Sequence, residues 1–152
     1  MTDELEEDPF AGLDDQPGSD AVAPPGAQDE DLEPAGQLFY GSVDEFVRKH
    51  LRFQYRRVVA RPGRGEFRWK AAWWQSEEAV SRLEAVWRMW EAARQAPAAV
   101  SSIWWLSHCD RHMQVLLSPS GPFANSTDEN KPGEPLPCTP APDRWFAPDR
   151  QP

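Results

Sequence analysis

The sequence predicts a mainly α-helical fold: a small single-domain bundle of three main helices with a tryptophan-rich core, flanked by disordered tails. Seven of the eight tryptophans lie between residues 69 and 117. Apolar side chains recur at helical spacing in three segments between residues 43 and 117. Both ends of the chain are rich in proline and poor in large apolar side chains. Such segments bury too little surface to offset the entropy lost on ordering.

We therefore divide the chain into a disordered acidic N-terminal tail (1–36), a tryptophan-rich helical domain (37–127) and a disordered proline-rich C-terminal tail (128–152). The first 36 residues hold twelve acidic side chains and no Lys or Arg, whereas residues 37–117 hold thirteen Lys and Arg against eight Asp and Glu. The formal net charge of −9 is thus set by the N-terminal tail. The helical domain itself is mildly basic.

The first helix is expected over residues 43–57. Ser42 followed by Glu45 matches a capping box, in which both side chains bond to free backbone N–H groups at the helix start. Apolar side chains then fall on one side of a helical wheel and basic side chains on the other. His50 lies on the apolar side, which favours a histidine in or beside the core. After a loop rich in Arg and Gly, residues 66–69 alternate enough to allow a short strand.

The second helix is expected over residues 77–96. Ser76 can cap its start, and two glutamates in the first turn suit the positive end of the helix dipole. A wide apolar stripe that includes Trp87 and Trp90 marks the face toward the core. Pro97 should end the helix, because proline cannot continue it.

The third helix is expected over residues 102–117, with Ser101 or Ser102 as its cap. Helical spacing places one set of apolar side chains on a common face: Trp105, Leu106, Cys109, Met113, Leu116 and Leu117. The same wheel points Trp104 outward, where the loop 118–127 covers it or solvent reaches it. The C-terminal tail carries one aromatic island, Arg144-Trp145-Phe146.

The order of landmarks along the chain points to a family. These landmarks are Phe46-Val47, Trp73-Trp74, the run from Glu78 to Glu91, Ile103-Trp104-Trp105, the run from Asp110 to Met113, and Gly121-Pro122-Phe123. Over residues 38–124 the set resembles the actinobacterial family of domain of unknown function 4913. The resemblance implies an actinobacterial origin, often near plasmid, phage or integrative-element genes. It implies no activity.

Basic residues are concentrated between residues 48 and 68, a stretch that we name the basic span. They are Arg48, Lys49, Arg52, Arg56, Arg57, Arg61, Arg64 and Arg68, with only Glu66 opposing them. A basic helix face followed by an arginine-rich loop suits contacts to nucleic-acid phosphates. The alternative is an ordinary solvated helix face, which the modest net charge of the domain favours.

Trp73, Trp74 and Trp104 are the candidates for a partner-binding surface. Tryptophan is enriched at binding hot spots, and helical spacing does not bury all three. The alternative for these residues is packing in the core, which is the role that we expect for the other helical tryptophans.

His108 and His112 stand four residues apart, a spacing at which two side chains of one helix can bind the same metal ion. The zinc-protease pattern needs a glutamate directly after the first histidine, and Cys109 occupies that position. Cys109 should also face the core, with no helix start or glycine-rich turn to activate it as a nucleophile. We therefore expect two surface histidines beside a buried cysteine, with no bound metal, no cofactor and no enzymatic activity.

The function class that these patterns favour is a non-enzymatic binding or accessory module that holds an unknown protein partner. The alternative is a nucleic-acid-binding accessory factor acting through the basic span, and the third hypothesis is a metal-binding protein or enzyme at His108 and His112. Two cysteines give no disulfide framework, and the N-terminus lacks the pattern of a signal peptide. No apolar run is long enough to cross a membrane. We expect a cytoplasmic protein with no membrane partner.

Overall fold

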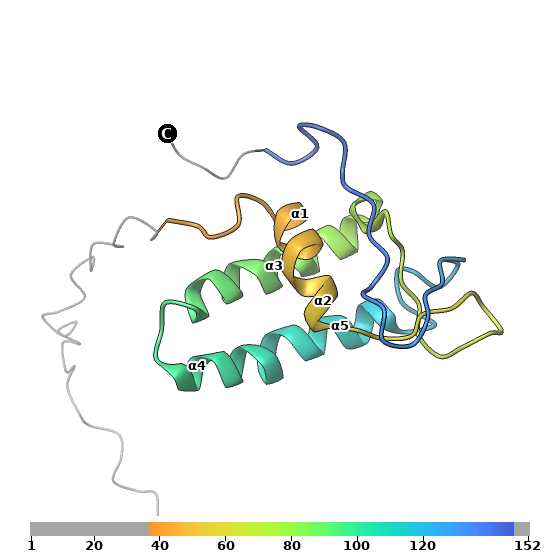
Figure 1. Ribbon diagram of the computed structural model, residues 1–152, viewed down its shortest axis with the longest axis horizontal. Helices are drawn as coiled ribbons and strands as arrows, with labels where there is room; N and C mark the ends of the chain where they lie inside the picture. The colour runs from red at the N-terminus through yellow and green to blue at the C-terminus, as the bar shows by residue number, and fades with distance from the viewer. Residues whose placement is uncertain (1–36, 148–152) are drawn as a thin grey trace, which may run out of the picture. The chain divides into compact units, whose positions relative to one another are not determined.

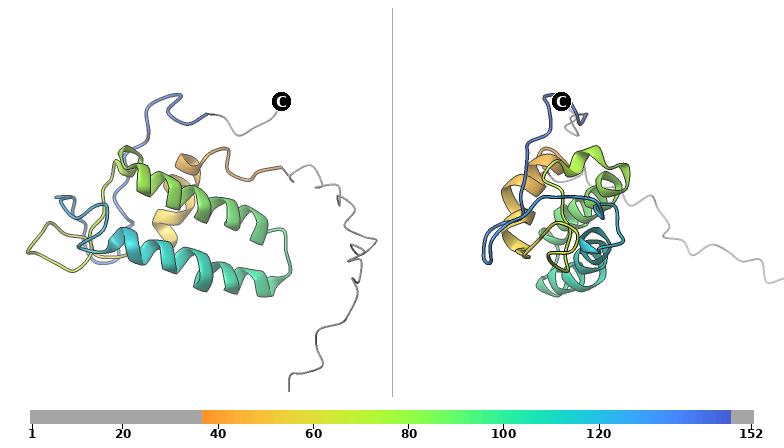
Figure 2. Two further views of the ribbon diagram at one scale, coloured as in Figure 1. Left: turned by 180° about the vertical axis from the view of Figure 1, so that it is seen from behind. Right: turned by 90° about the vertical axis from the view of Figure 1, so that its right-hand side faces the viewer.

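The computed structural model describes residues 37–147, so the tail expected at residues 1–36 and the last five residues of the tail expected at 128–152 lie outside the described residues. Within residues 37–147 the protein forms three main helices and no β-strand, which confirms the predicted fold class. Figures 1 and 2 show the second and third helices side by side and antiparallel, with the first helix lying across them. The loops between the helices gather at the end opposite the α3–α4 turn.

The first main helix contains a π-helical turn in its middle. It consists of α1 (Val43–Phe46), the π-helical turn η1 (Val47–Leu51) and α2 (Arg52–Gln54). The expected capping box forms: the Ser42 hydroxyl accepts the N–H of Glu45 at 3.2 Å, and the Glu45 carboxylate accepts the N–H of Gly41 at 2.7 Å. This places the helix start where the sequence predicted it.

The first helix ends three residues earlier than expected, at Gln54 rather than at residue 57. Tyr55 leaves the helical conformation, with φ −107° and ψ 65°. Its ring is buried, and its hydroxyl donates a hydrogen bond to the Asp110 carboxylate at 3.0 Å. The contact with the third helix therefore overrides the helical periodicity, and Val58 beyond it is exposed.

The second main helix is α3 (Glu77–Ala93), preceded by a 3₁₀ turn η2 (Trp73–Gln75). Ser76 caps it as expected, since its hydroxyl accepts the N–H of Ala79 at 3.2 Å. The helix ends at Ala93 instead of residue 96. A turn then leads to Pro97.

The third main helix also contains a π-helical turn. It consists of α4 (Ala98–Ile103), η3 (Trp104–Cys109) and α5 (Asp110–Leu117). It begins four residues before the predicted start, because Pro97 takes the capping position and its carbonyl accepts the N–H of Val100 at 2.9 Å. The predicted caps Ser101 and Ser102 lie inside the helix. Proline is well suited to a helix start, since its φ is already helical.

The core is rich in tryptophan and other aromatic side chains, as the sequence predicted. The largest fully buried side chains include Trp69, Trp73, Trp87, Phe46 and Phe123. The short strand expected at residues 66–69 is reduced to a single bridge between Val59 and Phe67, so that prediction was wrong.

Residues 128–147, which we name the C-terminal segment, pack against the helices. The predicted domain boundary at residue 127 is therefore wrong for this stretch. Leu136 is fully buried, and the backbone of its neighbour Pro137 accepts the indole N–H of Trp69 at 2.8 Å. The side chain of Arg52 donates to the Leu136 carbonyl at 2.9 Å. One buried leucine and several tertiary hydrogen bonds offset the ordering entropy of a segment whose composition alone predicts disorder.

A glycine allows the chain to turn from the third helix toward the C-terminal segment. A Cβ atom on Gly121 would collide with the backbone carbonyl of Val115, so a side chain is excluded at this point. The loop that follows buries Phe123 edge-on against Trp69, with ring centroids 5.3 Å apart.

Candidate functional site

A surface cavity lies between the first, second and third helices. We name it the aromatic hollow, and its volume is about 200 Å³. Its lining is formed by His50, Trp90, Ala93, Arg94, Ser101, Trp104 and Trp105. The first helix contributes His50 from η1, and the third helix contributes both of the last two tryptophans from η3. Both π-helical turns thus contribute side chains to the lining of the hollow.

The π-helical turn η3 explains why the helical wheel misplaced two side chains. A π-helical turn has more residues than an α-helical turn, so it shifts the register of the side chains around the helix. Trp104, which a regular wheel points outward, is 3% exposed, whereas Leu106, expected in the core, is 65% exposed. Trp105 is half-buried beside Trp104, with ring centroids 4.9 Å apart. Two consecutive tryptophans therefore both reach the region of the hollow.

Aromatic rings form most of the wall. The His50 ring lies 4.8 Å from the Trp90 ring and 5.5 Å from the Phe46 ring, measured between centroids. Tyr55 stacks on the outer side of Trp105 at 6.4 Å. Burial lowers the pKa of His50 below its ordinary value of 6.5, so the imidazole is mainly neutral at pH 7. The aromatic part of the wall is consequently uncharged, although it contains a histidine.

A buried carboxylate, which does not itself line the hollow, holds Arg94 at the rim. Glu91 is 5% exposed and accepts the side-chain N–H of Arg94 at 2.7 Å and the indole N–H of Trp87 at 3.2 Å. It also accepts the backbone N–H groups of Phe39 and Tyr40 at 3.1 and 3.0 Å. Burial alone would raise the pKa of Glu91, but these hydrogen bonds and the Arg94 charge outweigh it, and the pKa lies below 4.5.

Few polar groups of the hollow are already bonded to the protein. The indole N–H of Trp104 donates to the Val86 carbonyl at 3.0 Å. The indole N–H groups of Trp90 and Trp105 have no hydrogen-bond partner among residues 37–147. An apolar cavity with a small number of available donors is the usual construction of a binding site.

The predicted partner-binding tryptophans do not form one surface. Trp73 and Trp104 are buried, which matches the alternative of core packing, and partner binding through the three tryptophans stays a prediction. Trp74 is half-buried, and its indole N–H donates to the Thr139 carbonyl at 3.0 Å. Trp90 and Trp105, expected in the core, are only partly buried, and sequence reasoning missed them as site residues. One feature of the sequence could have indicated the site. Ser101 lies one helical turn before Trp105 and close to Trp104, and all three line the hollow.

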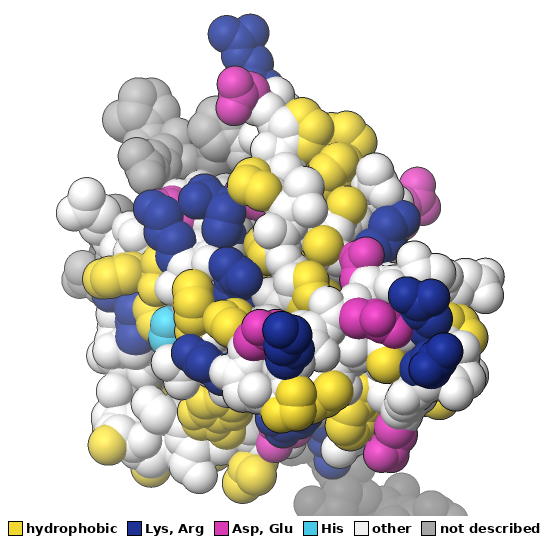
Figure 3. All heavy atoms as spheres, turned by 45° about the vertical axis from the view of Figure 1, so that its right-hand side comes forward, with side chains coloured by type: hydrophobic (Ala, Val, Ile, Leu, Met, Phe, Trp, Pro, Cys, Tyr) yellow, Lys and Arg dark blue, Asp and Glu magenta, His cyan; other side chains and the backbone are white. Residues whose placement is uncertain are grey.

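Much of the basic span makes contacts within the chain. Arg52 and Arg56 donate to backbone carbonyls of the C-terminal segment at 2.9 and 2.6 Å. Arg61 pairs with Glu129 of the same segment at 2.9 Å. Arg48 and Lys49 pair with acidic residues one turn earlier on their own helix. On the face drawn in Figure 3, Lys and Arg side chains lie in small groups separated by acidic and apolar ones.

The remaining arginines of the span differ in exposure. Arg68 is 5% exposed, and its side chain donates to backbone carbonyls of the surrounding turn, so it is not available as a surface contact. Arg57 lies over the Tyr55 ring at 4.3 Å, and Arg64 is exposed in the loop. Nucleic-acid binding through the whole span stays a prediction, with fewer available cations than the sequence suggested.

The two histidines do not converge on a third ligand. His112 Nδ1 lies 3.1 Å from an Arg82 side-chain nitrogen, and burial and the nearby cations lower its pKa. Among the described residues no group of three or more His, Cys, Asp or Glu is arranged to hold a metal ion. Cys109 is buried as expected, and burial raises the pKa of its thiol to about 12. A thiol of that pKa is protonated at neutral pH and is a poor nucleophile.

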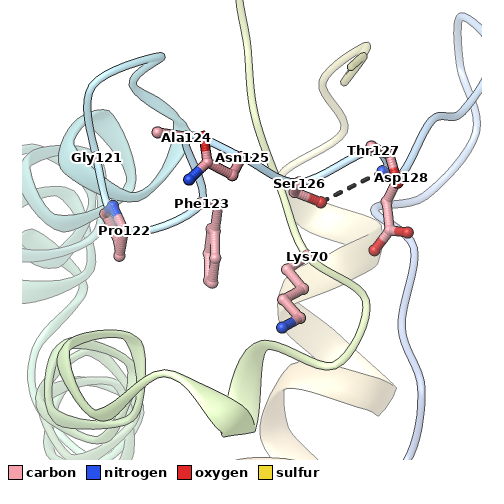
Figure 4. A pocket seen from close by; sticks show the side chains of 9 residues that line it. All are labelled: Lys70, Gly121, Pro122, Phe123, Ala124, Asn125, Ser126, Thr127 and Asp128. Carbon is pink, nitrogen blue, oxygen red and sulfur yellow. Dashed lines mark hydrogen bonds between the residues drawn. The ribbon is translucent and has the colours of Figure 1, made fainter. Parts of the chain in front are cut away.

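A more open hollow of about 400 Å³ lies between Lys70 and the loop 121–128. Figure 4 shows that its lining mixes polar side chains with apolar ones such as Phe123, and that Ser126 is bonded to the backbone of Asp128. The Asp128 carboxylate already accepts the N–H of Ala71 at 2.7 Å. Part of the polar lining of this second hollow is thus used to hold the loop. The second hollow is therefore a weaker candidate for a binding site than the aromatic hollow.

The fold is that of a small three-helix domain with a cavity walled by aromatic rings. A family model described as Domain of unknown function (DUF4913) matches residues 40–142, and the chain therefore belongs to this family. The match extends through most of the C-terminal segment, which agrees with the packing of that segment on the helices. Comparisons with curated proteins and with solved structures found no match. No helix within residues 37–147 has both the length and the apolar character that a membrane crossing requires.

Proposed function

We propose that this domain is a non-enzymatic binding module that receives one apolar or aromatic side chain of a partner protein in the aromatic hollow. The observation that carries the proposal is an aromatic-walled cavity to which both π-helical turns contribute side chains. π-Helical turns occur frequently at functional sites, where they present side chains that a regular helix would not. A cavity of about 150 Å³ is enough to hold a benzene ring, so about 200 Å³ suits one side chain.

The surroundings of His50 support binding rather than catalysis. Its ring makes contacts with Tyr40, Phe46 and Trp90, and within residues 37–147 no hydrogen bond orients it. A catalytic histidine normally has one nitrogen held by a carboxylate or a carbonyl, which fixes the tautomer. His50 therefore acts as part of an apolar wall in this proposal.

The experiment fills the hollow without removing any core contact. Ser101 lines the hollow and is exposed, so Ser101→Trp places a large ring in the cavity. Ser102→Trp is the matched control, because Ser102 is equally exposed on the same helix and does not line the hollow. The full-length chain is used to select binders from a displayed library of random peptides, and fluorescence polarisation then measures the affinity of the selected peptides.

We expect the selected peptides to share one large apolar or aromatic residue. Ser101→Trp should weaken their binding about tenfold or more, which corresponds to about 1.4 kcal/mol, while Ser102→Trp should leave it unchanged. Peptides that bind both variants and the original chain equally would exclude the hollow as the site.

We extend this proposal to a cellular setting: a cytoplasmic accessory protein of an actinobacterial mobile element. The support is the resemblance of the landmark motifs to those of the family. The genes beside those of family members provide the test. Repeated neighbours for integration, replication or transfer would support the setting, and neighbours with no such bias would remove it.

A further inference from the structure

The Trp73–Trp74 pair forms a second surface, and the chain covers it with its own residues 142–147, which we name the aromatic clip. Trp145 packs edge-on against Trp74 with ring centroids 4.6 Å apart. Phe146 stacks on Trp73 with centroids 5.8 Å apart and an interplanar angle of 16°. We propose that the surface beneath the clip is a docking site for a partner segment in which a basic residue is followed by two aromatic residues. The clip occupies this site until such a segment displaces it.

The clip is attached more weakly than the rest of the C-terminal segment. The last backbone bond to a helix is donated by Ala141 to the Asp44 carboxylate at 3.2 Å. Beyond it, among the described residues, the hydrogen bonding of the clip is internal, from the Trp145 N–H to the Pro142 carbonyl at 3.0 Å. Trp145 remains 51% exposed. Two ring contacts therefore provide most of its attachment, whereas several bonds and buried Leu136 hold the preceding residues.

The clip backbone is also strained. Arg144 has a φ of 64°, and it is the one non-glycine residue with positive φ in the part of the chain that the structure describes. This left-handed conformation is unfavourable for a side chain with a Cβ atom. The seated clip holds Arg144 in it so that both following rings reach their tryptophans. Release of the clip removes the strain, which favours displacement by a segment that binds without it.

The chemistry of the surface identifies the partner. Two open hollows of about 540 and 590 Å³ flank the clip. Apart from the clip residues, the charged side chains that line them are Asp44, Glu45, Arg48, Glu77 and Glu84. Asp44 and Glu45 are paired with Arg48 and Lys49, so Glu77 and Glu84 supply the negative charge of the rim around the aromatic floor. The seated Arg144-Trp145-Phe146 shows which side-chain order fits, and the rim favours a positive charge beside the two rings.

The test uses the full-length chain and a fluorescent synthetic peptide with the sequence of residues 139–147. In the variant Trp145→Ala/Phe146→Ala the intramolecular competitor is removed, so the peptide should bind at least about tenfold more tightly than to the original chain. A control peptide with alanine in place of Trp and Phe should not bind. Adding Glu77→Gln and Glu84→Gln to the double variant should weaken the peptide about threefold.

Trp145→Ala alone provides a second test, because Phe146 still covers Trp73 in that variant. It should raise the peptide affinity by a smaller factor of about three, with a circular-dichroism spectrum equal to that of the original chain. Equal affinity for the original chain and both variants would overturn the proposal. Dimers of the original chain that are lost in the double variant would assign the site to the clip of a second copy, and would also overturn it.

Discussion

The aromatic hollow and the Trp73–Trp74 surface are both made of tryptophan side chains, yet the chain leaves the first open and covers the second. The walls of the hollow stand on long helices, and Glu91 fixes its rim with four hydrogen-bond donors. Trp73 and Trp74 stand on a single 3₁₀ turn. The C-terminal segment bonds to Trp74 and places a ring over each tryptophan.

The difference shows how position in the fold decides the role of a tryptophan. A side chain in the middle of a long helix is supported by the helix on both sides, so it can border an open cavity. A tryptophan in a short turn lacks that support and depends on another segment to remove its surface from water. The hollow is therefore a property of the helices, and the covered surface is a property of the loops.

The largest expected effect compares one tryptophan from each region. Trp104→Ala should lower the free energy of unfolding by about 4 kcal/mol, because it empties a buried site and removes a hydrogen bond. Trp145→Ala should cost less than about 1 kcal/mol, since this side chain is half exposed. Urea unfolding measures both values. A comparable loss from Trp145→Ala would mean that the clip is part of the core and would contradict its release.

A second prediction concerns Glu91 and acid. Its pKa is lower in the folded state than the ordinary 4.5, so the stabilisation is present above pH 4.5 and is lost as the pH falls through the folded pKa. Glu91→Gln should remove this acid dependence and cost about 2 kcal/mol at neutral pH. Urea unfolding at several pH values between neutral and acidic measures both the cost and its dependence on pH.

The control for that experiment is Glu84→Gln, which changes a half-buried carboxylate on the clip side of the same helix. It should change the free energy of unfolding by less than about 0.5 kcal/mol. If the Glu91→Gln variant loses stability in acid as much as the original chain does, carboxylates other than Glu91 cause the acid dependence.

The smallest expected effect is a pH dependence of binding in the hollow alone. Burial lowers the pKa of His50 below 6.5, and an apolar ligand would bury it further. The neutral form is therefore favoured in the complex, and affinity should fall modestly as the pH drops through the lowered pKa of His50. His50→Gln should abolish this dependence in fluorescence polarisation. Peptide binding at the Trp73–Trp74 surface should not follow the same curve, because His50 does not line it.

Local patterns in the sequence predicted the helices and their starts where capping is local. Ser42 and Ser76 cap the first two helices as expected, because each cap depends only on residues within one turn. The wheel also placed His50 and Trp90 toward the apolar side. The ends of the helices were less predictable. Tyr55 leaves its helix to reach Asp110, a residue far away in the sequence.

By itself, then, the sequence determined a tryptophan-rich domain of three main helices, because periodicity and capping act between near neighbours. The tertiary structure decided which tryptophans are open, which are buried and which are covered. The π-helical turns changed the direction of Trp104 and Leu106, and burial of Leu136 seated a proline-rich segment whose composition predicts disorder. Both outcomes depend on contacts between distant segments, whose packing energy exceeds the local preferences that a sequence displays.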